Sequence, residues 1–398
     1  MAEALKRQLG LGLLIAYGVG IMVGAGIYVL VGAAAGAAGI WAPLSFLLAG
    51  LVSVPTALSF AELSARIPEA AGDSSYVEFG LHRHGLAVLV GWINVVAGTV
   101  ASAAVLRGGV GYLTSVLPVG FEVAVIGLGL GLTLIALIGA LESLVFAALM
   151  TVAEVIGLLL VSWVGLTAAP VAEWTAPAAP QWSGVAAATL FAFFAFIGFD
   201  DLVNMAEETR RPERTMPRAI LIALAITAVL YMTVSLAAVR TVDRDLLGVS
   251  ERPLALVWET ATGRSAAFLS LIAVAAALNG VLAQIVMAAR VLYGLGKRSP
   301  GLRLFRHAHP RFGTPVLATV VIGAVVIGAA LAMPVAALAE VTSLALLIVF
   351  AIVNAALIGL KRQAPEAPFR VPAYVPWLGL AGCVAAFAAA TLAGGGGA

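Results

Sequence analysis

Long apolar stretches separated by short polar segments fill almost the whole chain. Eleven of them have about the 20 residues or more that a helix needs to cross the hydrocarbon core of a bilayer. We place these spans at approximately residues 11–37, 40–65, 85–116, 121–139, 143–167, 184–206, 217–239, 265–296, 314–333, 336–360 and 373–394. The polar segments are too short for a soluble domain. The pattern therefore predicts an all-α polytopic membrane protein with about 11 transmembrane helices, forming a single transmembrane domain over 1–398.

The first span carries many glycines for a membrane helix. Its central stretch, GVGIMVGAGIYVLVG over residues 18–32, holds five, although each interior glycine destabilises a helix by about 1 kcal/mol relative to alanine. Small residues spaced four apart let helices pack closely, which is one interpretation. The other is an unwound segment at Gly24, Ala25 and Gly26, where free amides bind a carboxylate and free carbonyls bind a cation or an ammonium group.

A second interruption falls five spans later. The sixth span, FAFFAFIGFDDLVNMAEE, loses its apolar character at Ile197-Gly198-Phe199 and continues with Asp200 and Asp201. Interrupted helices in corresponding positions are typical of transporters built from inverted repeats. The spacing therefore predicts a five-plus-five inverted repeat with broken helices 1 and 6. We place the two repeats at 11–167 and 184–360, and a peripheral helix at 373–394.

Composition and charge support this picture and orient it. The 398 residues are 62% hydrophobic and 11% charged, whereas a soluble protein carries about 25% charged residues. The net charge of +2 is too small to indicate nucleic-acid binding. With the N-terminus in the cytoplasm, most of the 22 lysines and arginines fall in inner loops, as the positive-inside rule requires. The outer loops then hold only Arg240, Arg244, Arg252 and Arg264. We therefore expect a plasma-membrane protein with a cytoplasmic N-terminus, and the bias towards arginine and alanine favours a prokaryotic inner membrane.

Four stretches resemble a known family. They are YGVGIMVGAGIYVLVG, SFAELSARIPEAAGDSSYVE, FFAFIGFDDLVNMAEETRRPERTMP and ALNGVLAQIVMAARVLYGLGKRSPGLRLFRHAHPRFGTP. They are similar to the first, second, sixth and eighth helices of amino acid–polyamine–organocation (APC) transporters, most of all to bacterial relatives of the cationic amino acid transporter branch. The resemblance covers about Leu11 to Arg362 and implies a secondary amino acid transporter that works by alternating access. Such transporters often have 12 spans or more, so the far end of this chain departs from the usual plan.

The resemblance also implies how a substrate is held. Amides of the first break would bind the substrate carboxylate, and main-chain carbonyls of both breaks would bind its α-ammonium group. The residues in these two roles are Met22, Gly24, Ala25, Gly26, Phe194, Ala195 and Ile197. The ring of Phe194 or Phe196 would close over the substrate as a gate, with lipid or core packing as the alternative for both.

Glu154 lies midway along the fifth span, where a charge costs about 2.5–3.5 kcal/mol on insertion scales. In several proton-linked relatives a lysine occupies what resembles this position. A buried carboxyl group can gain and lose a proton near neutral pH, which predicts Glu154 as a proton carrier. A hydrogen-bonded structural role is the alternative. The stretch 271–289 contains no serine or threonine of the kind that sodium sites in this fold use, so we expect protons rather than sodium.

Other charged positions bear on gating and substrate choice. Arg290, near the cytoplasmic end of the eighth span, could pair with Asp200 as an inner gate, or snorkel to the interface. In the third span, Ala97 stands where relatives with cationic substrates often carry glutamate. Arg107, further along, could snorkel to the interface as a structural residue, and it would also repel cations. We therefore expect proton-coupled transport of a neutral amino acid. The alternatives are an exchanger, a transporter of polyamines or modified amino acids, and, from a different class, a channel or a sensor that does not transport.

No residue pattern indicates catalysis. A nucleophile, base and orienting group do not occur together among the spans, so we expect neither enzyme activity nor a cofactor. The four histidines fall in predicted cytoplasmic loops, where solvated side chains are the default interpretation and no metal site is expected. They are His82, His84, His307 and His309.

Overall fold

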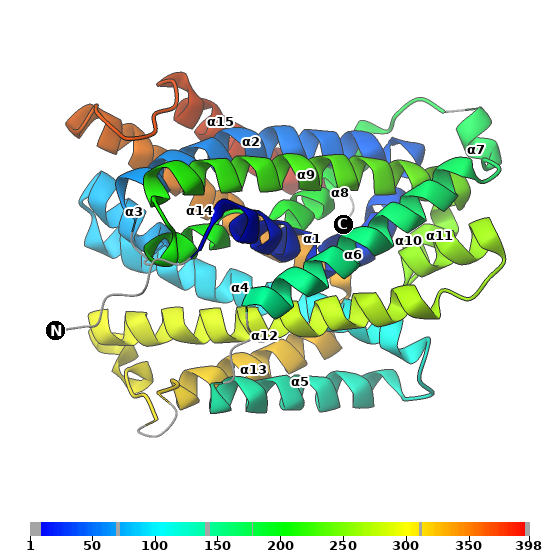
Figure 1. Cartoon of the computed structure of the whole chain (residues 1–398), viewed down its shortest axis with the longest axis horizontal. Coiled ribbons are helices and arrows are strands. Elements are labelled where there is room, and N and C mark those ends of the chain that lie inside the picture. The colour runs from blue at the N-terminus through cyan, green and yellow to red at the C-terminus, as the bar shows by residue number, and fades with distance from the viewer. Residues whose placement is uncertain (1–8, 69–71, 140–143, 177, 310–312, 395–398) are drawn as a thin grey trace.

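Each predicted span coincides with helix in the computed structural model, which describes residues 9–68, 72–139, 144–176, 178–309 and 313–394 (Figure 1). The matching helices are α1 (Leu11–Ala38), α2 (Ala42–Arg66), α4 (His84–Thr114), α5 (Phe121–Ile138), α6 (Leu144–Thr167), α8 (Trp182–Phe196) with the 3₁₀ helix η2 (Asp201–Glu208), α9 (Pro212–Thr241), α12 (Ala267–Arg298), α13 (Val316–Ala332), α14 (Val335–Gln363) and α15 (Tyr374–Gly394). Within the described residues, nine helical stretches are long and apolar enough to cross a membrane, and Leu11–Gly24 and Val316–Ala332 are shorter apolar helices. The prediction of an all-α polytopic membrane protein is confirmed.

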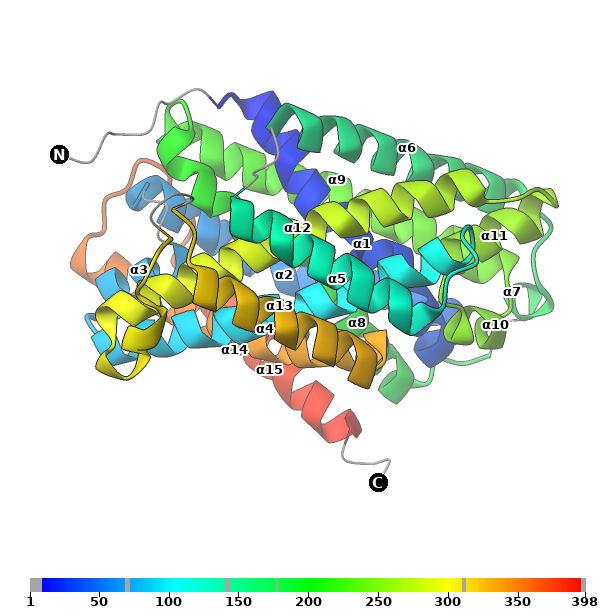
Figure 2. The same cartoon turned by 90° about the horizontal axis from the view of Figure 1, so that it is seen from below.

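The segments between the spans also contain short helices, which the sequence pattern did not predict. They are η1 (Gly39–Trp41), α3 (Gly72–Leu81), α7 (Ala172–Thr175), α10 (Arg244–Val249), α11 (Pro253–Thr262) and η3 (Pro300–Phe305). Helices this short are marginal by themselves in water and depend on tertiary packing, which no local pattern reveals. Figures 1 and 2 show α3 and η3 at one end of the bundle and α7, α10 and α11 at the other.

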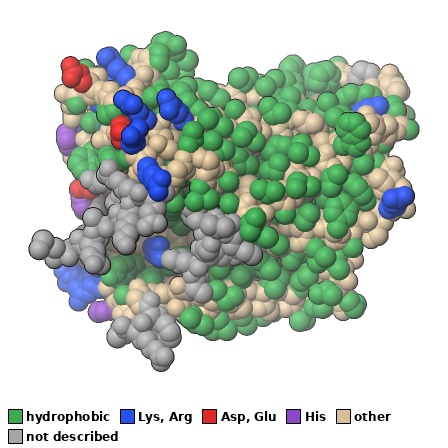
Figure 3. All heavy atoms as spheres, in the orientation of Figure 1, with side chains coloured by type: hydrophobic (Ala, Val, Ile, Leu, Met, Phe, Trp, Pro, Cys, Tyr) green, Lys and Arg blue, Asp and Glu red, His purple; other side chains and the backbone are tan. Residues whose placement is uncertain are grey.

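Charge is divided between the two ends of the molecule. In Figure 3, basic side chains gather at the end that holds the start of α1, while a broad apolar belt covers the middle. Exposed side chains of the belt include Leu130 and Leu134 on α5 and Val321 and Val325 on α13. A belt of this kind suits contact with lipid chains. Lys6 and Arg7, which count among the basic residues expected on the inner side, lie outside the described residues.

The buried apolar side chains form two clusters. The larger contains most of the buried residues of α1, α2, α8, α9 and α14. The smaller is built mainly from α4, α5, α12 and α13, and takes in Leu30 of α1 and Phe194 of α8. Figure 1 shows α1 in the middle of the bundle, between the two groups of helices. The two interrupted helices therefore lie where the clusters meet.

A buried ion network attaches the last helix at the basic end of the molecule. The Glu62 carboxylate is fully buried and accepts hydrogen bonds from Arg66 on one oxygen, at 2.6 and 2.9 Å. Its other oxygen lies 2.7 Å from Lys361 Nζ and accepts from the Val371 amide at 2.8 Å. Arg66 also donates to the carbonyls of Ala364 and Glu366. The network therefore joins α2, α14 and the segment that leads into α15.

Lys361→Met should lower the stability of the protein by about 1.5–3 kcal/mol, the usual contribution of a hydrogen bond to a charged group. The loss should appear as a lower melting temperature in detergent. Arg362→Met is the matched control, because Arg362 is exposed and its neighbour in the chain makes the contacts. Equal melting temperatures for the two variants would contradict a stabilising role for the network.

Candidate functional site

The first break is a single kink in α1. Gly24 has φ 19° and ψ −153°, outside the helical region, while the helix continues on both sides. A Cβ atom built on Gly24 would meet no other atom within 4 Å, so this face of the backbone borders open space. The prediction of a broken first helix is confirmed, and the side chain of Ala25, which follows, lies outside the described residues.

The second break separates α8 from η2. α8 ends at Phe196, Ile197 is extended with ψ 140°, and Gly198 has φ 125°. Only glycine tolerates that φ without strain. A Cβ on Gly198 would also meet the main chain of Ile21 and Met22 at 3.3 Å, so the absence of a side chain lets the two broken helices touch. The Gly198 amide donates to Asp200 Oδ1 at 3.0 Å, which caps the turn.

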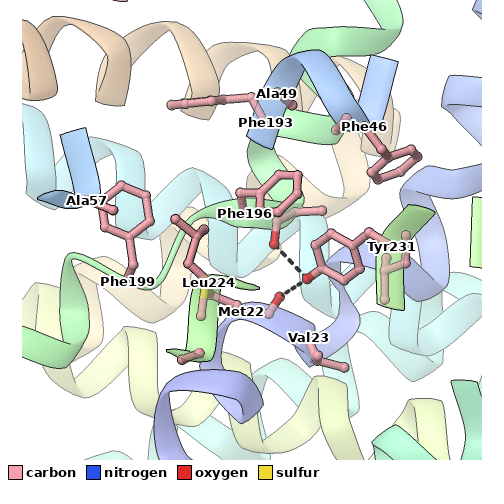
Figure 4. Packing of buried hydrophobic residues seen from close by; sticks show 14 of the residues in the cluster. Met22, Val23, Phe46, Ala49, Ala57, Phe193, Phe196, Phe199, Leu224 and Tyr231 are labelled. Atoms are coloured by element: carbon pink, nitrogen blue, oxygen red, sulfur yellow. Dashed lines mark hydrogen bonds between the residues drawn. The ribbon is translucent and has the colours of Figure 1, made fainter. Parts of the chain in front are cut away.

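Tyr231 of α9 joins the two breaks. Its hydroxyl donates to the carbonyl of Met22 at 2.5 Å and lies 2.7 Å from the carbonyl of Ala195 (Figure 4). The side chain is fully buried and its ring packs edge-on against Phe196, with centroids 5.0 Å apart. Two of the carbonyls expected to hold the substrate ammonium group are therefore already contacted by a hydroxyl.

Tyr231 was not among the site residues predicted from the sequence. The available signal was a lone tyrosine in the middle of the apolar run ALAITAVLYMTVSLAAV, where a phenolic hydroxyl needs a hydrogen-bonding partner. Nothing in the sequence says that this partner lies on α1 and α8, since 209 residues separate Tyr231 from Met22.

Tyr231→Phe should lower the melting temperature, because both break carbonyls lose their contact with the hydroxyl while the ring stays packed. The expected cost is about 1–3 kcal/mol for the lost hydrogen bonding. If a substrate ammonium group replaces the hydroxyl, saturating substrate should raise the melting temperature of this variant more than that of the wild type.

Tyr112→Phe is the matched control for this prediction. Tyr112 is also fully buried, and its hydroxyl bonds the Tyr28 carbonyl at 2.6 Å and the Leu254 amide at 3.2 Å, away from Met22 and Ala195. It should lose stability without an enlarged response to substrate. An equal response in both variants would contradict the replacement.

The other predicted substrate contacts, Gly26, Phe194 and Phe196, all pack against neighbouring residues. A Cβ on Gly26 would lie 3.2 Å from the Ala195 Cα, so Gly26 serves the close approach of the two helices. Phe194 is 7% exposed and packs with the smaller cluster, on the far side of the break from Tyr231. Phe196 belongs to the larger cluster beside Tyr231. The two gate candidates therefore point into different cores.

Glu154 lies on α6 beside α1. The Tyr28 hydroxyl donates to the Glu154 main-chain carbonyl at 2.9 Å, while the carboxyl atom Oε2 is buried and has no hydrogen-bonding partner among the described residues. The side chain borders a cavity of about 210 Å³ between α6 and α12 whose other lining is apolar: Met150, Ala153, Leu271, Ile272, Ala275 and Ala276. A carboxylate anion without a partner is unfavourable in such surroundings, so the neutral acid suits this conformation better.

The C-terminal half of α1 packs closely against α10. Gly36 and Gly248 approach so closely that a Cβ on Gly36 would lie 2.8 Å from the Gly248 Cα. A Cβ on Gly32 would meet the Leu247 carbonyl at 2.6 Å. These glycines therefore allow the close approach of α1 and α10.

Three acidic side chains, Asp73, Asp200 and Asp201, lie close together just after the second break. Asp200 is buried, Asp201 accepts a hydrogen bond from Gln284 at 3.1 Å, and Asp73 of α3 accepts one from Asn94 at 2.8 Å. Arg290 is exposed, and within the described residues no ion pair joins it to Asp200. The expected inner-gate pair is thus not formed in this conformation.

Arg107 lies away from the breaks. Its guanidinium donates to the Ala330 carbonyl of α13 at 2.7 Å and stands 4.9 Å from the centre of the Phe121 ring. With these partners, Arg107 is not placed to repel a cationic substrate beside Gly24.

Burial raises the pKa of Asp73 to about 7, and the negative charge of Asp200 adds to the rise, against the opposing hydrogen bond from Asn94. The unfolded carboxyl titrates near pH 4, so between about pH 4 and 7 the folded protein binds more protons than the unfolded chain. The free energy of unfolding should therefore fall as pH rises through this window. Asp73→Asn should flatten the fall by up to about 1.4 kcal/mol per pH unit.

Melting curves between pH 5 and 8 measure this effect. The exposed Asp245→Asn is the control and should keep the wild-type slope. Parallel profiles for the wild type and Asp73→Asn would show that Asp73 does not titrate in this range.

Comparisons with known proteins identify the family of this chain. The sequence profile of a family described as amino acid permease matches residues 9–397. The branched-chain amino acid permease BcaP of Bacillus subtilis is 27% identical over 96% of this chain and 88% of its own length. A methylthioribose transporter of the same organism is 30% identical over 86% of this chain and 78% of its own. Cationic amino acid transporter 4 of Homo sapiens is 31% identical over 82% of this chain and 55% of its own. The chain therefore belongs to the amino acid permease family of the APC superfamily of membrane transporters.

Proposed function

We propose that this protein is a secondary active transporter that moves neutral amino acids by alternating access and couples them to protons. The observation that carries the proposal is the meeting of two helix breaks in the buried centre, next to open space at Gly24. Backbone groups released from helical bonding can bind the charged ends of an amino acid without any charged side chain.

The substrate carboxylate would lie beside Gly24, at the amides of Gly24, Ala25 and Gly26. The α-ammonium group would approach the carbonyls of Met22 and Ala195, which the Tyr231 hydroxyl contacts in this conformation. It would also approach the carbonyls of Phe194 and Ile197. The Phe194 carbonyl accepts from the Ile197 amide at 3.1 Å, so it has one lone pair left for a substrate. Phe194 is the better gate candidate, since its ring lies in the smaller cluster and that of Phe196 beside Tyr231.

A neutral side chain suits the apolar surroundings of the breaks. Ala97 is buried on α4, and Phe194 and Ile197 pack with the smaller cluster. The similarity to a branched-chain amino acid permease supports an apolar substrate. Arg107 gives no support for a neutral substrate, because its guanidinium binds the Ala330 carbonyl of α13.

A cationic or polyamine substrate is the second candidate. The carboxyl groups of Asp73 and Asp200, which are buried, and of Asp201, which is half-buried, lie near the second break and would attract a positively charged group. The similarity to a cationic amino acid transporter agrees with this possibility. Arg290 could then pair with Asp200 once a cation has left, as an inner gate in another conformation.

The proposed cycle rests on two repeats, over 11–167 and 184–360, each of which begins with a broken helix. α15, the helix expected at 373–394, packs outside them against α2 and α14, and its Cys383 Sγ lies 3.6 Å from Thr56 Oγ1 of α2. The two apolar clusters would rock against each other about the breaks. We place the N-terminus in the cytoplasm and the protein in a prokaryotic plasma membrane, because the basic end shown in Figure 3 holds the start of α1.

A thermal-shift screen of the detergent-solubilised protein against amino acids and polyamines tests the substrate class. Uptake and counterflow in proteoliposomes then test transport itself. Saturable, counterflow-competent uptake of a neutral amino acid supports the proposal. Stabilisation by diamines alone would favour the second candidate, exchange without any response to a pH gradient would indicate an exchanger, and ion conductance at channel rates would contradict a transporter.

A further inference from the structure

An apolar groove opens beside the connection between α12 and α13. It has a volume of about 460 Å³ and is bordered by Leu304, His307, His309, Val316, Leu317 and Val320. Three of these side chains are well exposed: Leu304 by 68%, Val320 by 44% and Leu317 by 38%. Since α13 begins at Val316, the groove lies at the end of a membrane span, where acyl chains meet lipid headgroups.

Two arginines lie next to the lining residues of this groove in the chain. Leu302 and Phe305 of η3 pack inward against the smaller cluster, whereas Leu304 and His307 border the groove. Arg303 precedes Leu304, and Arg306 precedes His307 just after the end of η3; both arginines are exposed. These two arginines form a basic edge beside the apolar floor.

The surrounding chain has one sign of charge. The sequence holds no aspartate or glutamate between Glu259 and Glu340. The connection from 290 to 314 contributes Arg290, Lys297, Arg298, Arg303, Arg306 and Arg311. Basic groups at the cytoplasmic surface are attracted to anionic lipid headgroups.

We propose that this groove binds an anionic phospholipid of the cytoplasmic leaflet. One acyl chain would lie over Val316, Leu317 and Val320, and the phosphate would contact Arg306 and His307 at the edge. The apolar floor and the basic edge match the two halves of such a molecule, which neither a soluble anion nor a neutral lipid does. The proposal rests on the cytoplasmic orientation of this end, which belongs to the proposed function.

The test measures melting temperature in detergent with added dioleoyl-phosphatidylglycerol or dioleoyl-phosphatidylcholine. A ligand that binds only the folded state raises the melting temperature. We expect the anionic lipid to give a shift at least about twice that of the zwitterionic one. The double variant Arg303→Gln/Arg306→Gln should lose the difference, and so should Val320→Trp, which fills the groove and leaves the charges in place. Arg264→Gln, an exposed arginine at the opposite end, should keep it.

Three outcomes would overturn the proposal. They are equal shifts for the two lipids in the wild type, a preference that survives in both groove variants, and an equal shift with glycerol phosphate, which lacks acyl chains. Because no transport is measured, failure here leaves the transport proposal standing. If the transport experiments fail, the melting-temperature shifts with the two lipids still test the lipid proposal.

Discussion

Gly24→Val should abolish substrate binding while the protein remains folded and inserted. A side chain at this position would project into open space rather than into a neighbour, since no atom lies within 4 Å of a Cβ there. That space is where the substrate carboxylate would meet the backbone amides. Each hydrogen bond to a charged group contributes about 1.5–3 kcal/mol, so the loss of two should raise the dissociation constant of the substrate by about 100-fold or more. Isothermal titration or substrate-induced thermal shift measures the loss.

The control is Gly127→Val on α5, where a Cβ likewise meets nothing within 4 Å. It places the same side chain in an open position on a different helix and should bind substrate normally. Gly26→Val is unsuitable, because its Cβ would press on the Ala195 main chain and separate the broken helices. Wild-type affinity in Gly24→Val would mean that the space beside this glycine holds no substrate.

Glu154→Gln should retain binding and exchange but lose accumulation driven by a pH gradient. Glutamine has the shape of the protonated acid, and the carboxyl borders an apolar cavity with Oε2 unpartnered, so the neutral amide should be accepted there. A carrier that cannot release a proton can exchange substrate but cannot use the gradient. One pH unit can drive about tenfold accumulation at one proton per substrate, and the variant should accumulate none.

Uptake into proteoliposomes with an acidic exterior, measured with and without sodium, checks this expectation. Glu340→Gln, on the outer part of α14, is the control and should accumulate substrate like the wild type. Equal gradient-driven uptake in the wild type and Glu154→Gln would remove this residue from the coupling mechanism. A joint loss of stability and of exchange would instead identify Glu154 as a structural residue.

The sequence predicted the broken helices well because each break has a local cause. In α1 the cause is the glycine pair at 24 and 26, and after α8 it is Gly198 followed by two aspartates. A helix that loses side chains and gains charge in mid-membrane shows this in its own residues. The short helices α3, α10 and α11 gave no such signal, since they are stabilised by contacts with distant parts of the chain.

Distant contacts also corrected the assignment of roles. Sequence alone could not separate Gly24, which borders open space, from Gly26, which packs against Ala195, because the two differ only in what faces them. For Arg107 the sequence left a structural role and repulsion of cations both open, and its bond to a carbonyl of α13 favours the structural role. Tyr231 was not predicted as a site residue, yet it joins both breaks.

The sequence by itself determined that this chain is a polytopic helical membrane protein with two interrupted spans, since apolar length and glycine or charge within a span act locally through the cost of exposing backbone and charge to lipid. The tertiary structure alone decided which backbone groups face each other, which carboxyl groups are buried without a cation, and which aromatic rings belong to which core. Those properties depend on packing between helices up to hundreds of residues apart, and a chain carries no local record of which neighbour it will meet.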